Sequence, residues 1–289
     1  MKDITQRYHL LMACPDHLGI IHAVCGVLAA MNSNIVAFDQ HSEGPDGGYF
    51  FMRAEFDAPG DTFSPSQLEA ALGELFPSGR FAWQLRANGR VPRLGVLVSK
   101  EGHCLEELAW QIGRGDIPAE IAVVISNHPD LAPIAQQFHL PFFRVEVAPH
   151  HRKEAEAHLT QILLDHHVDT VILARYMQIL TDDFIQHYPQ QIINIHHSFL
   201  PAFVGAKPYH QAYQRGVKLI GATAHYVTAE LDGGPIIEQD VHRVDHRHQV
   251  EDYKRIGRTV ERLVLARAVT WHVEGRVLLH GNRTIVFPI

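Results

Sequence analysis

Cysteine and long hydrophobic runs are both scarce in this sequence. Only three cysteines occur among 289 residues, at positions 14, 25 and 104, and so odd and scattered a set does not predict a disulfide framework. No apolar run approaches the length that crosses a membrane, and residues 1–7 lack the apolar core of a secretory signal. We therefore expect reduced thiols, no membrane partner and a cytoplasmic location.

Positive charge is also in short supply. The chain has 25 Lys and Arg against 32 Asp and Glu, a net charge of -7 with the histidines neutral. This balance disfavours a general nucleic-acid-binding surface, so we expect no nucleic-acid partner. Histidine is abundant, with 22 residues, but no His-Glu-x-x-His or Cys-x-x-Cys motif accompanies it. We therefore expect no metal site and interpret most histidines as solvated surface residues.

The first 86 residues show the pattern of a small α/β domain. Strand-like runs and amphipathic helical runs alternate, and Glu43 to Gly48 forms a strong turn signal between two strands. The expected strands are 7–14, 35–41, 49–56 and 81–85, and the expected helices are 20–31 and 66–75. The order strand-helix-strand-strand-helix-strand predicts a ferredoxin-like fold.

A polar linker with Gly and Pro, residues 87–93, separates this domain from a second one at 94–289. There, strands expected at 94–99, 120–126, 141–145, 168–174 and 192–196 alternate with helices at 105–112, 131–138, 153–166 and 182–187. Such alternation predicts a doubly wound, mostly parallel sheet. Further elements are expected as a helix at 206–216, a strand at 236–241, a helix at 250–272 and a hairpin at 276–287. The candidate buried positions include Ala157, Ile162 and Leu164, and Val260, Leu263, Val264, Ala266 and Val269.

Two polar residues interrupt the strand at 192–196. Asn194 and His196 are two positions apart, so both side chains project to one side, while Ile193 and Ile195 point into the core. They lie at the carboxyl end of a strand, where open α/β sheets bind their ligands. We therefore interpret the pair as a candidate site.

A second stretch, 225–235, supplies a carboxylate. It leaves a strand at His225 and turns at Asp232-Gly233-Gly234, where glycine lets the backbone approach a ligand closely. Asn194 would stabilise an oxyanion, His196 would transfer protons, and Asp232 would orient the imidazole or activate a water. Whether His196 or Asp232 is the base stays open, and a strand-end hydrogen-bond network is the alternative interpretation.

Asn-Ile-His-x-Ser-x-Leu-Pro at 194–201, followed by His225 and Asp232-x-Gly-Pro, resembles the folate-dependent formyltransferase family. The resemblance implies that the segment 173–180 forms a pterin pocket with Met177, Gln178, Ile179 and Leu180. It also implies substrate contacts from His225, Leu231 and Gly233, and Lys207 could meet the glutamate tail of a folate. A folate is thus the expected substrate, and no tightly bound cofactor is expected.

The loop at 99–107 favours one branch of that family. It has a single glycine, Gly102, instead of a phosphate-cradling glycine-rich loop, and Glu101, Glu106 and Glu107 would repel a phosphate. This loop and His197, where proline is common in the transferases, resemble the deformylase branch, although the role of His197 is open. That resemblance implies hydrolysis of 10-formyltetrahydrofolate to formate and tetrahydrofolate, which would supply formate for purine synthesis and balance one-carbon pools. Cys104 is interpreted as a bystander thiol.

Two other functions remain as alternatives. One is formyl transfer to an amine acceptor, which the same trio would serve. The other is a catalytically silent sensor, which the intact trio disfavours.

The first domain resembles an ACT domain through Asp16-x-x-Gly19-Ile20. The resemblance implies an amino acid effector, such as glycine or methionine, at Asp16, His17 and Gly19, with Asn32 and Asn34 opposite. It also implies a homo-oligomer, a dimer or tetramer. The alternatives are that Asp16 caps a helix, that Gly19 eases a turn, and that the domain serves dimerisation alone.

Overall fold

A computed structural model describes residues 5–44, 46–76, 81–148, 151–202 and 208–287. It contains two compact units, one formed by Met1–Arg90 together with Gly275–Ile289 and the other by Val91–Glu274. The change of unit at 90–91 falls within the predicted linker. Across the described ranges, not one helix combines the length and hydrophobicity needed to cross a bilayer.

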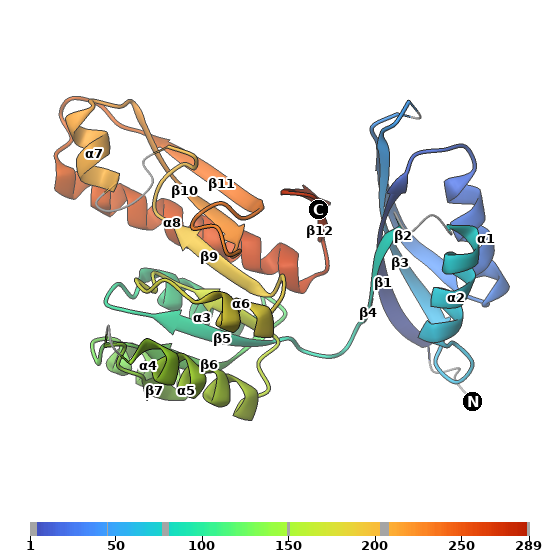
Figure 1. Cartoon of the computed structure of the whole chain (residues 1–289), viewed down its shortest axis with the longest axis horizontal. Coiled ribbons are helices and arrows are strands. Elements are labelled where there is room, and N and C mark those ends of the chain that lie inside the picture. The colour runs from blue at the N-terminus through green and yellow to red at the C-terminus, as the bar shows by residue number, and fades with distance from the viewer. Residues whose placement is uncertain (1–4, 45, 77–80, 149–150, 203–207, 288–289) are drawn as a thin grey trace. The chain divides into compact units, whose positions relative to one another are not determined.

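The first unit contains an antiparallel sheet in the order β2-β3-β1-β4, the ferredoxin-like arrangement expected from the sequence (Figure 1). Its elements are β1 (Thr5–Pro15), α1 (Ile20–Ala30), β2 (Asn34–Ser42), β3 (Tyr49–Pro59), α2 (Pro65–Leu75) and β4 (Ala82–Ala87). Val24 and Leu28 of α1 and Leu72 of α2 have no exposed surface and pack in one core with Met12 and Phe56 of the sheet. The apolar faces of the two helices thus cover one side of the sheet.

The C-terminal hairpin covers the other side. Its strands are β12 (Val277–His280) and β13 (Arg283–Val286), and Leu278 and Phe287 pack with Leu11, Ala13 and Phe51. The sequence pattern predicts this hairpin as part of the second domain, but it packs in the first unit because the first sheet has a second apolar face. Alternating residues in a short hairpin show that one face is buried but not against which sheet.

The second unit is built on one seven-stranded sheet in the order β11-β10-β9-β8-β5-β6-β7. Its elements are β5 (Arg93–Val98), α3 (His103–Arg114), β6 (Glu120–Ser126), α4 (Ala132–Gln137), β7 (Phe142–Arg144), α5 (Arg152–Asp165), β8 (Thr170–Leu173), α6 (Asp182–His187), β9 (Ile192–His196), α7 (Pro208–Gln214), β10 (Leu219–Tyr226), β11 (Ile236–Arg243) and α8 (Val250–Val273). From β9 to β7 the strands are parallel, and β10 and β11 are antiparallel. The predicted doubly wound, mostly parallel sheet is confirmed.

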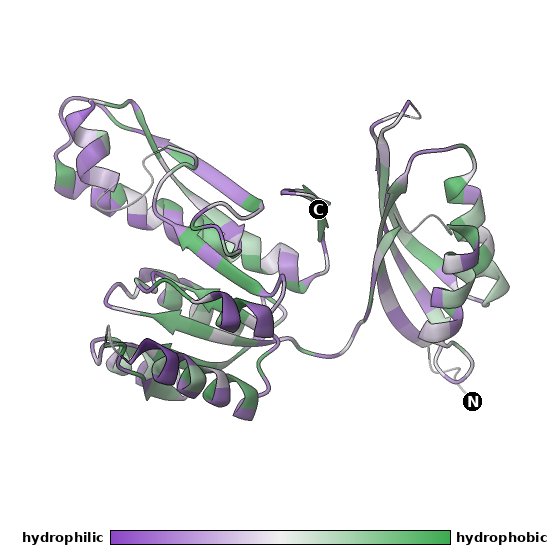
Figure 2. Cartoon of the chain, viewed as in Figure 1, coloured by the Kyte–Doolittle hydropathy of each residue, from purple (hydrophilic) through white to green (hydrophobic). Residues whose placement is uncertain are grey.

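Helices cover both faces of this sheet, as right-handed crossovers require. Leu159 and Leu163 of α5 and Phe184 of α6 pack on Leu97 and Val171, whereas α8 lies along β9, β10 and β11 and contacts α3. The parallel strands are largely hydrophobic, β11 is largely hydrophilic, and the helices carry hydrophilic residues beside hydrophobic ones (Figure 2).

Three predicted core positions of these helices were wrong: Ala157, Leu164 and Leu263 are exposed. Successive side chains of a helix differ by about 100° in direction, so a residue next to a buried one can point to solvent. In α5, Leu163 is buried and its neighbour Leu164 is exposed.

Chain order reverses beside β5. The chain runs from β5 outward through β6 to β7 and then returns to β8 on the other side of β5, so the loops after β5 and β8 diverge. Such a switch point is where open α/β sheets form a crevice at the carboxyl ends of their strands. The two loops are tied together, because the backbone N–H of Met177 donates to the Ser99 hydroxyl at 3.1 Å.

Candidate active site

Strand β9 presents Asn194 and His196 on one side, as its alternation predicts. Ile193 and Ile195 point to the core with 0% and 3% of their surface exposed. Asn194 is half-buried and His196 is buried, with only 6% exposed. The strand thus carries a carboxamide and an imidazole to the edge of the sheet without breaking the core beneath them.

His225 joins them from β10. The antiparallel register places His225 opposite Asn194, and its Nε2 atom lies 3.2 Å from the Asn194 amide nitrogen. Its Nδ1 atom lies 2.9 Å from the carbonyl oxygen of Tyr226, which can only accept, so Nδ1 carries the proton. Burial lowers the pKa of His225, so the ring is neutral at pH 7 and its Nε2 accepts from Asn194.

Asp232 arrives on the turn after β10, with a left-handed φ of 55°. The turn depends on Gly234, because a Cβ there would lie 1.8 Å from the carbonyl oxygen of Tyr226. Asp232 Oδ1 lies 3.3 Å from His196 Nδ1 and 3.8 Å from His225 Nε2. A hydrogen bond from His196 lowers the pKa of Asp232 below its usual range, so this group is a carboxylate.

The partners of His196 define its two nitrogens. Because the Asp232 carboxylate only accepts, Nδ1 of His196 is the protonated nitrogen. Its Nε2 is buried and has no hydrogen-bond partner within the described part of the chain. His196 therefore holds one nitrogen against a carboxylate and keeps the other available for a proton, the arrangement used in general acid–base catalysis.

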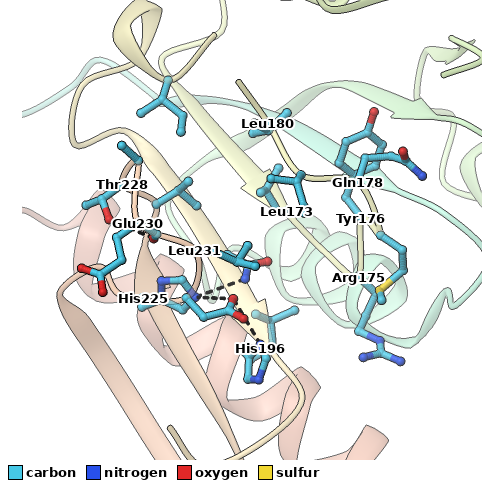
Figure 3. Close-up of a pocket in the computed structure, with 18 of the residues that line it drawn as sticks. Leu173, Arg175, Tyr176, Gln178, Leu180, His196, His225, Thr228, Glu230 and Leu231 are labelled. Carbon is cyan, nitrogen blue, oxygen red and sulfur yellow. Dashed lines mark hydrogen bonds and ion pairs between the residues drawn. The ribbon is translucent and has the colours of Figure 1, made fainter. Parts of the chain in front are cut away.

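A cavity of about 320 Å³ lies beside these groups. The loop 175–180 forms one wall and the segment 227–232 the other, with His196 and His225 between them (Figure 3). Large apolar side chains remain exposed there, namely Met177 (60%), Ile179 (58%) and Leu231 (57%). An apolar cavity with few convergent polar groups is the usual form of a small-molecule site.

Most of the predicted substrate positions line this cavity: Met177, Gln178, Ile179, Leu180, His225 and Leu231. Gly233 is not among its lining residues, and a Cβ there would meet the Glu230 side chain at 2.6 Å. Lys207 lies outside the described residues. Thr228 and Glu230 also line the cavity, and the sequence does not indicate this because polar residues of a turn carry no signal of their own.

Arg175, within the predicted pocket segment 173–180, is another residue whose role the sequence does not indicate. It follows β8 with a φ of 63°, lines the cavity, and lies 3.4 Å through Nε from Oε2 of Glu261 on α8. Glu261 has no exposed surface and contacts His103 on α3. The available signal was a carboxylate on an otherwise apolar helix face, between Val260 and Val264.

Three possible metal-ligand atoms lie within 4.8 Å of one another, on His103, Cys104 and Glu261. The sequence does not indicate this group, because Glu261 is far from the other two residues along the chain. Its chemistry does not suit a cation. The Glu261 oxygens accept from His103 and Tyr209, the Arg175 guanidinium lies beside them, and burial raises the pKa of the Cys104 thiol well above its usual range. We interpret His103 and Glu261 as part of a hydrogen-bonded cluster, with Cys104 as a buried thiol beside it.

The effector candidates fall into two groups in the first unit. Asp16, which accepts from Ser42, and His17 and Gly19 precede α1, whereas Asn32 and Asn34 follow it. Gly19 adopts a φ of 90°, so it serves the turn. An eleven-residue helix, roughly 16 Å long, separates the groups, so one chain does not bring them into a single site.

Comparisons with known proteins agree with this geometry. Residues 92–269 match the family model described as formyl transferase, and residues 8–76 match that of the ACT domain. A formyltetrahydrofolate deformylase of Bacillus subtilis (strain 168) is 51% identical over 96% of this chain and 93% of its own. The crystal structure of one from Pseudomonas syringae pv. tomato superposes with a TM-score of 0.90 at 44% identity, covering 99% and 96%. A glycinamide ribonucleotide transformylase from Symbiobacterium toebii gives 0.66 at 33% identity, covering 71% of this chain and 98% of its own.

Proposed function

The chain belongs to the formyltetrahydrofolate deformylase family and hydrolyses 10-formyltetrahydrofolate, and from that premise we propose that Asn194, His196 and Asp232 carry out the reaction. The observation that supports the assignment is the convergence of these three side chains, from β9 and the turn after β10, on the lining of one apolar cavity. The products are formate and tetrahydrofolate.

Asn194 is the oxyanion donor in this mechanism. Water adds to the formyl carbon, the C–N10 bond then breaks, and N10 takes up a proton. One amide hydrogen of Asn194 is engaged by His225 Nε2, and the second hydrogen is available to the oxygen that becomes negative. Removing a single donor of this kind costs about 3 kcal/mol of transition-state stabilisation.

His196 is the proton-transfer group and Asp232 its partner. The Nε2 atom of His196 takes a proton from the attacking water and returns it to N10. Asp232, kept ionised by its contact with His196, favours the Nδ1–H tautomer and stabilises the imidazolium while the proton resides on the ring.

His225 is a positioning residue. Its Nδ1 is committed to the Tyr226 carbonyl, so only its Nε2 can face Asn194, and it can only accept there. An acceptor at that point directs the amide nitrogen, rather than the amide oxygen, toward His225. The carboxamide is thereby held in one orientation with a fixed place for its second hydrogen.

The apolar walls suit the pterin ring and the adjoining aromatic group of a folate. Met177, Ile179 and Leu231 offer exposed apolar surface, and Gln178 supplies an amide for polar ring edges. A pterin buried between these walls would hold N10 and its formyl group near Asn194.

Hydrolysis by this site is tested with oxygen-labelled water. Purified protein and 10-formyltetrahydrofolate are incubated in H₂¹⁸O with no amine present, and the released formate is analysed by mass spectrometry. Enzymatic formate with one ¹⁸O atom is the expected product. Failure of a folded protein to release formate above the enzyme-free blank would contradict the proposal and favour transfer to an amine.

We also propose that the ACT unit binds a small amino acid, glycine or methionine, as an effector, and that the protein forms a dimer or tetramer. Because one chain separates the two candidate groups, a shared site would need Asp16 and His17 of one protomer and Asn32 and Asn34 of another. A ligand bound only to the native state raises the melting temperature. If either amino acid leaves both melting temperature and formate release unchanged, that amino acid is not the effector.

A further inference from the structure

A buried polar cluster adjoins the catalytic residues on the side where α3, α7 and α8 meet. It comprises His103, Arg175, Tyr209 and Glu261, which we call the Glu261 cluster. Glu261 has no exposed side-chain surface, and His103 and Arg175 have only 11% and 15%. His103 Nε2 lies 2.8 Å from one Glu261 oxygen, and the Tyr209 hydroxyl donates to the other.

The cluster is assembled for close contact. Burial alone would raise the pKa of Glu261, but the hydrogen bond from His103 and the charge of Arg175 outweigh it and hold the pKa at about 2. Gly257, one turn earlier on α8, makes room for Tyr209, because a Cβ there would lie 1.9 Å from the tyrosine oxygen. A side chain at position 257 would therefore displace Tyr209 from Glu261.

Two of its members follow the carboxyl ends of central strands: His103 opens the helix after β5, and Arg175 follows β8. His197, which is not a member, follows β9 and lies beside Tyr209. The crevice at such strand ends ordinarily accepts a ligand, and here the part of it next to the folate cavity holds the buried side chains of His103, Arg175 and Glu261.

His197 connects the cluster to the catalytic pair. Its ring centroid lies 5.4 Å from that of His196 and 5.9 Å from that of Tyr209. Burial and the nearby Arg175 lower the pKa of His197 to about 3, so it packs there as a neutral ring. In Figure 3 the Arg175 side chain extends away from Leu180, on the side of the cavity where His196 lies.

The cavity beside the catalytic residues has about 320 Å³. Beyond His197 and Tyr209, on the α7 side, lies a separate space of about 20 Å³ that is lined by none of Asn194, His196 and Asp232. A cavity must have about 10–15 Å³ of such volume to hold one water, so the smaller space has room for roughly one. With folate in the large cavity, an organic acceptor would need the room that the cluster fills.

We propose that the Glu261 cluster closes the acceptor side of the catalytic centre, so that water is the only nucleophile that reaches the formyl carbon. The inference rests on the proposed function and concerns its specificity. In hydrolysis a water oxygen bonds to the formyl carbon, and formate leaves while N10 is protonated. In transfer an amine nitrogen would form that bond, lose a proton, and leave as a formamide with the same release of tetrahydrofolate. Both routes use the same trio, so the filled crevice decides between them.

The test measures product partition. Wild type and Tyr209→Ala are given 10-formyltetrahydrofolate labelled with ¹³C in the formyl group, with glycinamide as a small amine, and N-formylglycinamide and formate are quantified by NMR against an enzyme-free blank. Wild type should release formate only. Tyr209→Ala should form N-formylglycinamide at about tenfold or more above the enzyme-free blank, the lower range for one misfitting group in a pocket. Tyr213→Ala, one turn along α7, is the matched control, since Tyr213 bonds Gln249 instead, and it should behave as wild type.

Several results would overturn the inference. One is a folded Tyr209→Ala protein that hydrolyses the substrate with an unchanged product ratio, and His103→Ala provides the same comparison if Tyr209→Ala does not fold. Formation of N-formylglycinamide by wild type would overturn it without any variant. By contrast, a wild type that releases no formate contradicts the proposed function, so the two failures are distinguishable.

Discussion

Replacement of Glu261 by glutamine should strongly destabilise the second unit. The substitution keeps the shape of the side chain but removes the charge at the centre of the Glu261 cluster. Arg175 then remains buried without the carboxylate that lies 3.4 Å from its Nε, and one of the two oxygens that accept from His103 and Tyr209 becomes an amide nitrogen. Removing one partner of a buried ion pair lowers the free energy of unfolding strongly, because the remaining charge is left buried without compensation.

The size of the effect follows from the pKa of Glu261. Its fall from 4.5 to about 2 on folding corresponds to roughly 3 kcal/mol, at about 1.4 kcal/mol per pKa unit. Because the folded pKa is the lower one, this stability is fully present above about pH 5 and is lost as pH falls through 4.5 toward 2. The Glu261→Gln variant lacks this pH-dependent contribution. The difference in unfolding free energy between wild type and variant should therefore shrink by about half near pH 3.

Urea unfolding at pH 7, 5, 4 and 3, followed by circular dichroism, measures this difference. Glu251→Gln on the same helix is the control, because Glu251 is exposed and its ion pair with Lys254 is a surface one, and it should match wild type. A Glu261→Gln protein as stable as wild type at pH 7 would refute the argument. So would a difference between the two proteins that is the same at every pH.

Three further substitutions test the site. Asn194→Ala should lower kcat by about 10²–10³ with little change in KM, because an oxyanion donor acts in the transition state, and steady-state kinetics decide it. Gly234→Ala should destabilise the protein by about 1–3 kcal/mol and lower kcat, since its methyl group would press on the Tyr226 carbonyl and shift Asp232; thermal unfolding and kinetics read both effects. Leu231→Asp should raise KM for the folate far more than it lowers kcat, because it puts a charge on an apolar wall; an unchanged KM would exclude Leu231 from binding.

Much of the fold follows from local patterns in the sequence. Largely apolar stretches such as 120–126, and 192–196 with its two polar residues, form strands of the second sheet with those same bounds. The C-terminal hairpin was assigned to the wrong unit because its short alternating strands do not specify their partner. Only the three-dimensional structure shows that the first sheet has two apolar faces, one for its helices and one for Leu278 and Phe287.

The site likewise has a part that the sequence indicates and a part that it does not. The spacing of Asn194 and His196 and the glycines after Asp232 indicated groups on one side of a strand and a close turn, and the structure brings all three together. The Glu261 cluster was not predictable, because its members come from α3, α7, α8 and the loop after β8. A buried carboxylate is recognised from the groups that contact it. One of these, His103, precedes Glu261 by 158 residues in the sequence.

The most direct test of the central claim is formate release in a single turnover without any amine acceptor. Wild type, Asp232→Asn and Asp183→Asn are compared, the last being an exposed aspartate at the start of α6. Wild type and Asp183→Asn should release formate at equal rates. Asp232→Asn should bind the folate, as judged by fluorescence, yet release formate about 10²–10⁴ times more slowly, the range for loss of general acid–base catalysis. An Asp232→Asn protein that releases formate at the wild-type rate would contradict the assignment of Asn194, His196 and Asp232 as the catalytic group.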